Sequence, residues 1–146
     1  MLHIKVFNPA TKPTSIEKDE IVQFLFDHLD EFGDDKSDIL KCVDYAVKDV
    51  SSFGGHILIG SVNDVIASIV IINKTGMKGY IPENILVYIA TNRDFRGQGI
   101  GKAMMEESIK LANGSIALHV EPNNPAKFLY EKLGFTNKYL EMRLTK

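Results

Sequence analysis

Three glycines within five residues, Gly97, Gly99 and Gly101, constrain this chain more than any other feature. The segment before them, 83–90 (ENILVYIA), has the composition of a strand covered on both faces, and 99–112 has the apolar spacing of an amphipathic helix. Glycine in regular structure costs about 0.5–1 kcal/mol relative to alanine, so we expect a turn here. Such a turn directs backbone N–H groups to one point at the positive end of the helix. The pattern therefore predicts an anion site at 96–102, in preference to a plain turn.

The glycine spacing argues against a nucleoside triphosphate or a dinucleotide as the anion. A Walker loop ending at Gly101-Lys102 would need glycine at Arg96 and a hydroxyl side chain at Ala103. A dinucleotide fingerprint starting at Gly97 would need glycine at Lys102. Both patterns fail, so the anion must be of another kind.

Hydrophobic periodicity in the rest of the chain predicts five more strands and three more helices. Thr14 or Ser15 caps the first helix, and Asn63-Asp64 joins two β-branched runs as a hairpin. The order β-α-α-β-β-β-α-β-α-β indicates an α/β domain with a mixed sheet. The predicted strands are 2–7, 56–62, 65–73, 116–121 and 139–144, and the predicted helices are 15–32, 37–53 and 125–134.

Composition excludes several classes of protein. A chain of 146 residues, 45% hydrophobic and 25% charged, is expected to fold as one soluble domain. Its formal net charge of −2 gives no field to recruit nucleic acid or an anionic membrane, and no apolar run approaches the ~20 residues of a membrane span. Cys42 is the only cysteine, and His3, His28 and His56 lack ligand spacing, so we expect neither a disulfide nor a metal. The N-terminus has no signal-peptide core, which favours a cytoplasmic protein.

Two motifs, in order along the chain, resemble the GNAT superfamily of acyl-CoA-dependent N-acyltransferases. The first, Arg/Gln-x-x-Gly-x-Gly/Ala, is met by Arg96, Gly99 and Gly101, and the second is the segment 124–135 (NPAKFLYEKLGF). The order of elements is similar too, although only in outline over the first half. The resemblance implies a single acyl-CoA N-acyltransferase domain over residues 1–146. Its fold would have three layers: a mixed, mostly antiparallel twisted sheet, splayed between the fourth and fifth strands, with helices on both faces.

The resemblance also implies where acetyl-coenzyme A binds. The backbone at 98–101 and the Arg96 side chain would hold the pyrophosphate, and the strand before the glycines would pair with the pantetheine. A backbone N–H at Val87 or Tyr88 would polarise the thioester carbonyl, as in an oxyanion hole. The implied coenzyme A ligands are Val87, Tyr88, Ile89, Ala90, Thr91, Arg96, Gly97, Gln98, Gly99, Ile100, Gly101, Lys102, Asn124, Lys127 and Tyr130.

Tyr130 matches the family's general acid, which protonates the departing thiolate; outside this motif a tyrosine on such a helix would be a core or surface residue. An amine must lose its proton before it attacks, so a base is expected as well. Counting back without gaps from Arg96 places Glu83 where some members carry a catalytic glutamate, and an exposed strand-edge carboxylate is an equally good interpretation. His119 and Glu121 share one strand face and are further candidates, although a packed or surface histidine is more typical.

We therefore expect direct transfer of an acetyl group from acetyl-coenzyme A to a primary amine of a small molecule or peptide. The alternative is a non-catalytic or regulatory module that binds coenzyme A. Only 136–146 follow the second motif, where most relatives have a longer hairpin, so the acceptor site is either open or completed by a second chain in a homodimer. An acidic cluster between the first two helices could attract a cationic amine, but a solvated loop is the favoured interpretation; its members are Asp30, Glu31, Asp34, Asp35 and Asp38.

Overall fold

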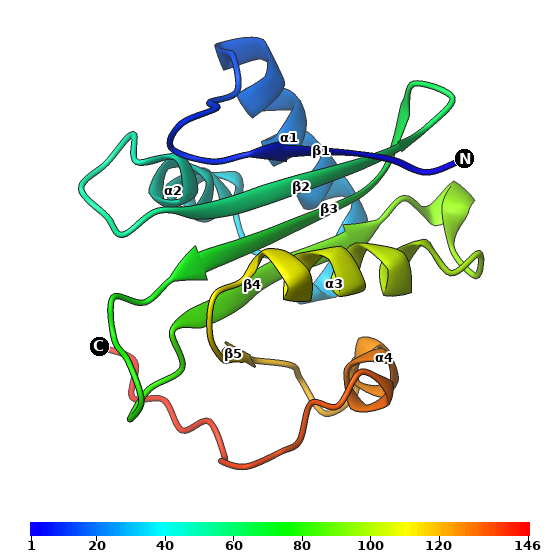
Figure 1. Cartoon of the computed structure of the whole chain (residues 1–146). Coiled ribbons are helices and arrows are strands. Elements are labelled where there is room, and N and C mark those ends of the chain that lie inside the picture. Colours follow the sequence, from blue (N-terminus) through cyan, green and yellow to red (C-terminus); the bar gives the residue numbers. More distant parts are fainter.

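The computed structural model describes residues 1–146 as five strands and four α-helices (Figure 1). The strands form one sheet in the order β1-β2-β3-β4-β5. Short 3₁₀ turns occupy Asp30–Phe32 and Arg93–Phe95. The elements are β1 (His3–Phe7), α1 (Ser15–His28), α2 (Lys36–Val47), β2 (Gly55–Val62), β3 (Val65–Lys74), β4 (Asn84–Thr91), α3 (Ile100–Leu111), β5 (Ile116–Leu118) and α4 (Ala126–Lys132).

The sheet is mixed and mostly antiparallel, as predicted. β1 to β4 pair antiparallel in sequence order, whereas β5 runs parallel to β4. The parallel contact is short: it joins Asn84 to Ile116 and ends where Leu86 faces Leu118. Beyond that point the two strands diverge, which confirms the splay expected between the fourth and fifth strands.

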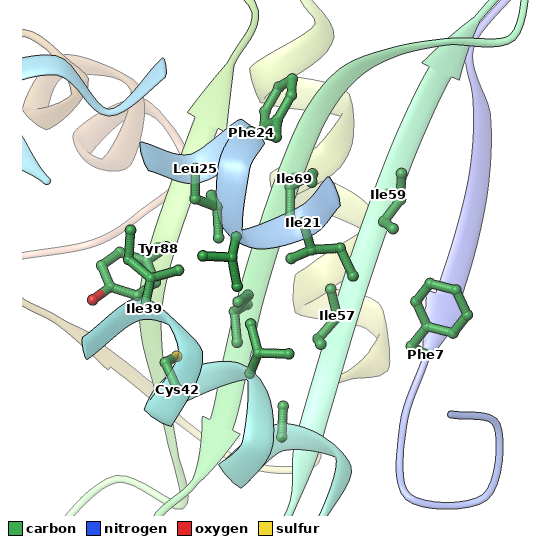
Figure 2. Packing of buried hydrophobic residues seen from close by; sticks show 14 of the residues in the cluster. Phe7, Ile21, Phe24, Leu25, Ile39, Cys42, Ile57, Ile59, Ile69 and Tyr88 are labelled. Carbon is green, nitrogen blue, oxygen red and sulfur yellow. The ribbon is translucent and has the colours of Figure 1, made fainter. Parts of the chain in front are cut away.

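Helices cover both faces of the sheet and create two separate cores. α1 and α2 lie on one face and α3 on the other, each against the central strands (Figure 1). Ile57 and Ile59 face the first pair of helices, while Leu58 between them faces α3. Because successive strand side chains point to opposite faces, a strand between two layers needs an unbroken apolar run. Figure 2 shows the core under α1 and α2.

Local capping and turn chemistry explain where several elements begin. Thr14 accepts a hydrogen bond from the Glu17 N–H, and the Glu17 carboxylate accepts one from the Thr14 N–H, so both residues cap α1. Asn63 and Asp64 adopt φ of 49° and 65°, the left-handed conformation that a tight two-residue hairpin needs. Gly60 of β2 also lets α3 pack closely on the sheet, because a methyl group at this position would lie only 2.6 Å from Met104 Sδ on that helix.

Three predicted boundaries and one predicted strand were wrong. α1 ends at His28 and not at 32, because Asp30 takes a left-handed conformation and begins a separate 3₁₀ turn. α2 ends at Val47, where Lys48 takes a left-handed conformation, so Val50 does not belong to its apolar stripe and is exposed. β5 stops at Leu118, not 121, because β4 has already diverged and provides no neighbour. No strand forms at 139–144, because an alternating pattern cannot form a strand without a neighbour to pair with, and none lies alongside. None of the helices has the length and apolar character that crossing a membrane would require.

Candidate active site

A bulge in β4 marks the point where the sheet splays. Ile71 of β3 faces Tyr88 and Ile72 faces Leu86, so Val87 is an extra residue without a partner. The Val87 side chain is 36% exposed, whereas those of its two neighbours are buried. β5 pairs with β4 only up to Leu86, so residues 87–91 have no strand beside them on that side. This half of β4 can pair with an extended ligand through its backbone.

The glycine turn lies directly after this unpaired half. Gly97 and Gly99 have φ of 78° and 77°, a conformation that favours glycine, and Gly99 caps the N-terminus of α3. A methyl group at either position would meet no atom within 4 Å. Glycine is therefore required here by the backbone conformation and not by a lack of space.

Gly101 places the turn against two other elements. A methyl group there would lie 3.6 Å from Leu129 Cδ2 of α4 and 3.7 Å from Thr91 Oγ1 at the end of β4. The unpaired end of β4, the start of α3 and α4 thus meet at one place. These are the elements that carry most of the predicted coenzyme A ligands.

The first turn of α3 has the electrostatics of an anion site. The N–H groups of a helix's first turn have no partner within the helix, and the helix dipole adds positive potential there. No acidic side chain lies in this turn, and no side chain caps it. Lys102 is exposed and forms no ion pair, so its charge adds to the dipole and leaves the positive potential uncompensated.

The Arg96 side chain is directed to the end of α1, which the sequence did not predict. Its Nε donates to Thr91 O at 3.1 Å, and its Nη2 donates to His28 O at 2.9 Å and to Asp30 Oδ2 at 3.3 Å. Arg93 joins the same cluster and donates to Asp30 and to the backbone of α1. Only Nη1 of Arg96 has no protein acceptor, so it is the part of the guanidinium free to bind an anion.

This arginine cluster changes the titration of its members. Hydrogen bonds from Arg93 and Arg96 lower the pKa of Asp30. Burial, followed by the positive charge of Arg93, lowers the pKa of His28. Asp30 belongs to the acidic cluster predicted to be solvated, and no spacing signal in the sequence pointed to its contact with the two arginines.

Tyr130 combines burial with a free hydroxyl. It lies on α4 at 7% exposure, in the core that also contains Leu86 and Ile100, and its ring centroid is 6.0 Å from that of Phe135. The hydroxyl makes no hydrogen bond with the protein, and burial raises its pKa to about 12. The group is therefore protonated at neutral pH and can donate a proton or a hydrogen bond to a ligand.

Glu83 is held at the opposite end of β4 from the glycine turn. Its Oε2 accepts from the Gly79 N–H at 2.9 Å, and its Oε1 accepts from the Ser115 N–H at 2.8 Å. These backbone bonds lower the pKa of Glu83, which makes its carboxylate a weaker base. The contacts tie the β3–β4 loop to the start of β5. His119 and Glu121 follow β5 as exposed residues.

Tyr88 faces α1 and α2, away from Tyr130. It is buried with the core residues under these two helices (Figure 2). Its hydroxyl donates to Asp34 Oδ2 at 2.5 Å, which joins the loop between the helices to the middle of β4. Burial, together with this carboxylate, raises the pKa of Tyr88. The acidic cluster is thus partly structural, because Asp30 and Asp34 both bond to residues of the β4–α3 region.

The remaining predicted residues have ordinary structural surroundings. Asn124 Oδ1 accepts from the Ala126 N–H at 3.0 Å at the start of α4. The Lys127 Nζ lies 5.6 Å from the Phe128 ring centroid and has no carboxylate partner. Cys42 is buried, which raises the pKa of its thiol to about 12. No group of three or more His, Cys, Asp or Glu side chains is arranged to hold a metal ion.

Solved structures with the same fold include two acetyltransferases. The ribosomal-protein-S18-alanine N-acetyltransferase from Escherichia coli is 19% identical at a TM-score of 0.68, over 93% of this chain and 78% of that chain. An aminoglycoside N-acetyltransferase in complex with coenzyme A is 14% identical at a TM-score of 0.71, over 100% and 95%. A transcriptional regulator from Bacillus halodurans C-125 is 17% identical at a TM-score of 0.70, over 99% and 100%.

A search of curated proteins finds no significant match, but the sequence does match a model of a protein family. The model described as "Acetyltransferase (GNAT) domain" matches residues 54–137, which is more than half of the chain and includes β2 to β5, the glycine turn and α4. This chain belongs to the GNAT acetyltransferase family.

Proposed function

We propose that this protein transfers the acetyl group of acetyl-coenzyme A directly to a primary amine. The observation that carries the proposal is the junction of an unpaired β4 edge with an uncompensated positive helix N-terminus. An extended pantetheine arm fits the first and a pyrophosphate fits the second. The domain would extend over residues 1–146.

The binding groups would follow from this placement. Backbone N–H groups at 98–101 would bind the pyrophosphate, with Lys102, Lys127 and the free Nη1 of Arg96 as nearby cations. The edge at 87–91 would pair with the pantetheine, and Asn124 would lie near its end. The bound coenzyme A in the aminoglycoside N-acetyltransferase structure supports this class of ligand.

In the reaction, the neutral amine nitrogen would attack the thioester carbonyl carbon and form a tetrahedral intermediate. A backbone N–H at Val87 or Tyr88 would stabilise its oxyanion, and removing such a donor typically costs about 10²–10³ in rate. The carbon–sulfur bond then breaks, and the thiolate takes the proton of the Tyr130 hydroxyl. The amine's proton passes to a base, and the products are an amide and free coenzyme A.

The base is Glu83, His119, Glu121 or water, and kinetics can separate them. Glu83→Gln, His119→Ala and Glu121→Gln are each compared through the pH dependence of kcat/KM. Loss of the acidic limb in one variant identifies the base. Retention of that limb in all three would assign the proton to water.

Ligand binding tests the coenzyme A site. Acetyl-CoA at about 100 times its Kd adds roughly 2.7 kcal/mol of stability, a Tm shift of several degrees. We expect this shift with acetyl-CoA and a much smaller one with NAD or ATP. Gly99→Glu, which places a carboxylate at the proposed pyrophosphate site, should abolish it, whereas Gly79→Glu in the β3–β4 loop is a control with a similar positive φ and should not. Equal shifts with all three ligands would refute the site.

A coenzyme A-binding module without turnover is the second candidate. The two backbone hydrogen bonds to the Glu83 carboxylate favour this second candidate, because they make one of the expected bases weaker. A panel of amines assayed for release of free thiol distinguishes the two. Thiol release with any amine establishes transfer, whereas binding without release across peptide N-termini, lysine, polyamines and amino sugars would favour the module.

A further inference from the structure

The segment after α4, residues 136–146, exposes a row of large apolar side chains. Tyr139, Leu140, Met142 and Leu144 are each between 79% and 88% exposed. The backbone makes a single internal hydrogen bond there, from the Lys138 N–H to Thr136 O, and no strand pairs with it. Contiguous exposed apolar surface of this kind marks an interaction surface.

The sequence of this segment has the two-residue period of a strand. Leu140, Met142 and Leu144 share one face of an extended chain, while Glu141 and Arg143 share the other. The Arg143 Nε donates to Glu141 Oε1 at 2.9 Å, as expected for side chains two residues apart on one side of an extended backbone. The segment leaves α4 as the red end of the chain in Figure 1. It has the pattern of a strand but no partner strand in its own chain.

We propose that two copies of this chain associate through this segment as an antiparallel ribbon centred on Met142. In this register Met142 faces the partner's Met142, and Leu140 faces the partner's Leu144. Glu141 faces the partner's Arg143 and Arg143 faces the partner's Glu141. Directly opposed apolar pairs and opposite charges both stabilise antiparallel strands. The contact is two-fold symmetric, as in most homodimers.

Other registers of the same two segments are less favourable. Centring the ribbon on Arg143 opposes two arginines, and centring it on Glu141 opposes two glutamates. A slip of one residue places apolar side chains opposite charged ones. The register centred on Met142 opposes like charges at one kind of position only, where Lys138 faces the partner's Lys146 at each end of the ribbon.

The ribbon is short, so the dimer should dissociate on dilution. Interfaces below ~1,200 Å² belong to weak or transient complexes, and a two-stranded ribbon is marginal by itself. We expect the average mass in sedimentation or light scattering to rise from one chain to two as the protein is concentrated. A single-chain mass at every concentration would overturn the proposal.

Charge reversal tests the register. Glu141→Lys and Arg143→Glu each replace both cross-strand attractions with repulsions, and each should weaken self-association about tenfold. When the two variants are mixed, each cross-strand pair again joins a basic side chain from one to an acidic side chain from the other, so a heterodimer should form. Glu131→Lys, a similar change at an exposed site on α4, is the control and should leave association unchanged. Failure of the mixture to associate would contradict the ribbon.

Cysteine substitution tests the centre of the ribbon. Met142→Cys should cross-link two chains under mild oxidation, because the two introduced thiols face each other. Leu140→Cys is the matched control and should cross-link poorly, because its partner position is 144. The natural Cys42 is buried and does not compete. Equal cross-linking of both variants would overturn the register, and thermal melts show that each variant is folded.

Discussion

The two halves of β4 differ in what lies beside them. Residues 84–86 have a strand on each side, β3 and β5, whereas residues 87–91 have β3 alone. Leu86 in the first half is 3% exposed, and Val87, which begins the second, is 36% exposed. An unpaired strand edge is normally a liability, because it can pair with any other chain. Its position before a glycine turn supports the proposal that an extended ligand pairs with this edge.

The same difference separates structural residues from residues available for chemistry. At the paired end, the Glu83 carboxylate is occupied by two backbone N–H groups. Near the unpaired end, the Tyr130 hydroxyl has no protein partner, and Lys102 has no counter-ion. Groups at the first end stabilise the fold, and groups at the second end are free to bind or react.

The largest effect is expected at the unpaired end. Tyr130→Phe removes one hydroxyl and keeps the ring, so kcat should fall about 10²–10⁴-fold if this group protonates the thiolate. The KM for acetyl-CoA should change little, since the proton moves only in the transition state. Steady-state kinetics of thiol release measure both quantities.

Tyr80→Phe is the matched control, because that tyrosine is 81% exposed in the β3–β4 loop. The Tm shift with acetyl-CoA shows that each variant is folded and binds. A folded Tyr130→Phe enzyme with kcat within threefold of the wild type would make Tyr130 a packing residue.

A second, smaller effect is expected on stability at the paired end. Leu86→Ala leaves a cavity in the core under α3 and should lower the free energy of unfolding by about 2–5 kcal/mol. Val87→Ala removes a side chain that is already partly in water and should cost less than about 1 kcal/mol. Urea unfolding of the two variants measures the difference. Equal losses in the free energy of unfolding would show that the Val87 side chain is packed as tightly as that of Leu86 in solution.

The smallest effect concerns the Glu83 contacts and their dependence on pH. The folded pKa of Glu83 lies below its usual value of 4.5, so its contribution to stability is complete above that pH. It disappears as the pH falls from 4.5 through the lower folded pKa. Glu83→Gln should lower Tm slightly at pH 7 and not at the acid end. Thermal melts of the variant and the wild type at the two pH values measure the difference, and an equal loss of Tm at both would contradict the prediction.

Short-range patterns were sufficient to predict most of the fold. A helix cap at Thr14 or Ser15, the Asn63-Asp64 turn and the glycine turn were all predicted, because each is specified by neighbouring residues, and the structure places the cap at Thr14. Continuous apolar runs likewise identified strands between two layers. The length of β5 and the missing strand at 139–144 were not predictable in this way, because both depend on a neighbouring strand that is remote in sequence.

The candidate site could be predicted only in part, for the same reason. The glycine motif placed the turn, and a family motif singled out Tyr130. The side chain of Arg96 was expected near a phosphate, but its bonds to His28 and Asp30 depend on how α1 packs beside the turn. Contacts between remote elements leave no spacing signal in a single sequence.

The extra residue at Val87 also sets the parity of β4. Leu86 faces the α3 core and Tyr88 faces the α1–α2 core, although residues two apart in a regular strand share a face. The bulge absorbs this extra residue, so Ile71 and Tyr88 still share the α1–α2 core while Ile72 and Leu86 share the α3 core. Deleting Val87 would place Tyr88 directly after Leu86, where regular alternation keeps it on the α1–α2 face. The deletion would therefore remove the bulge without exchanging the two cores, whereas an insertion elsewhere in β4 would turn every later side chain to the other face.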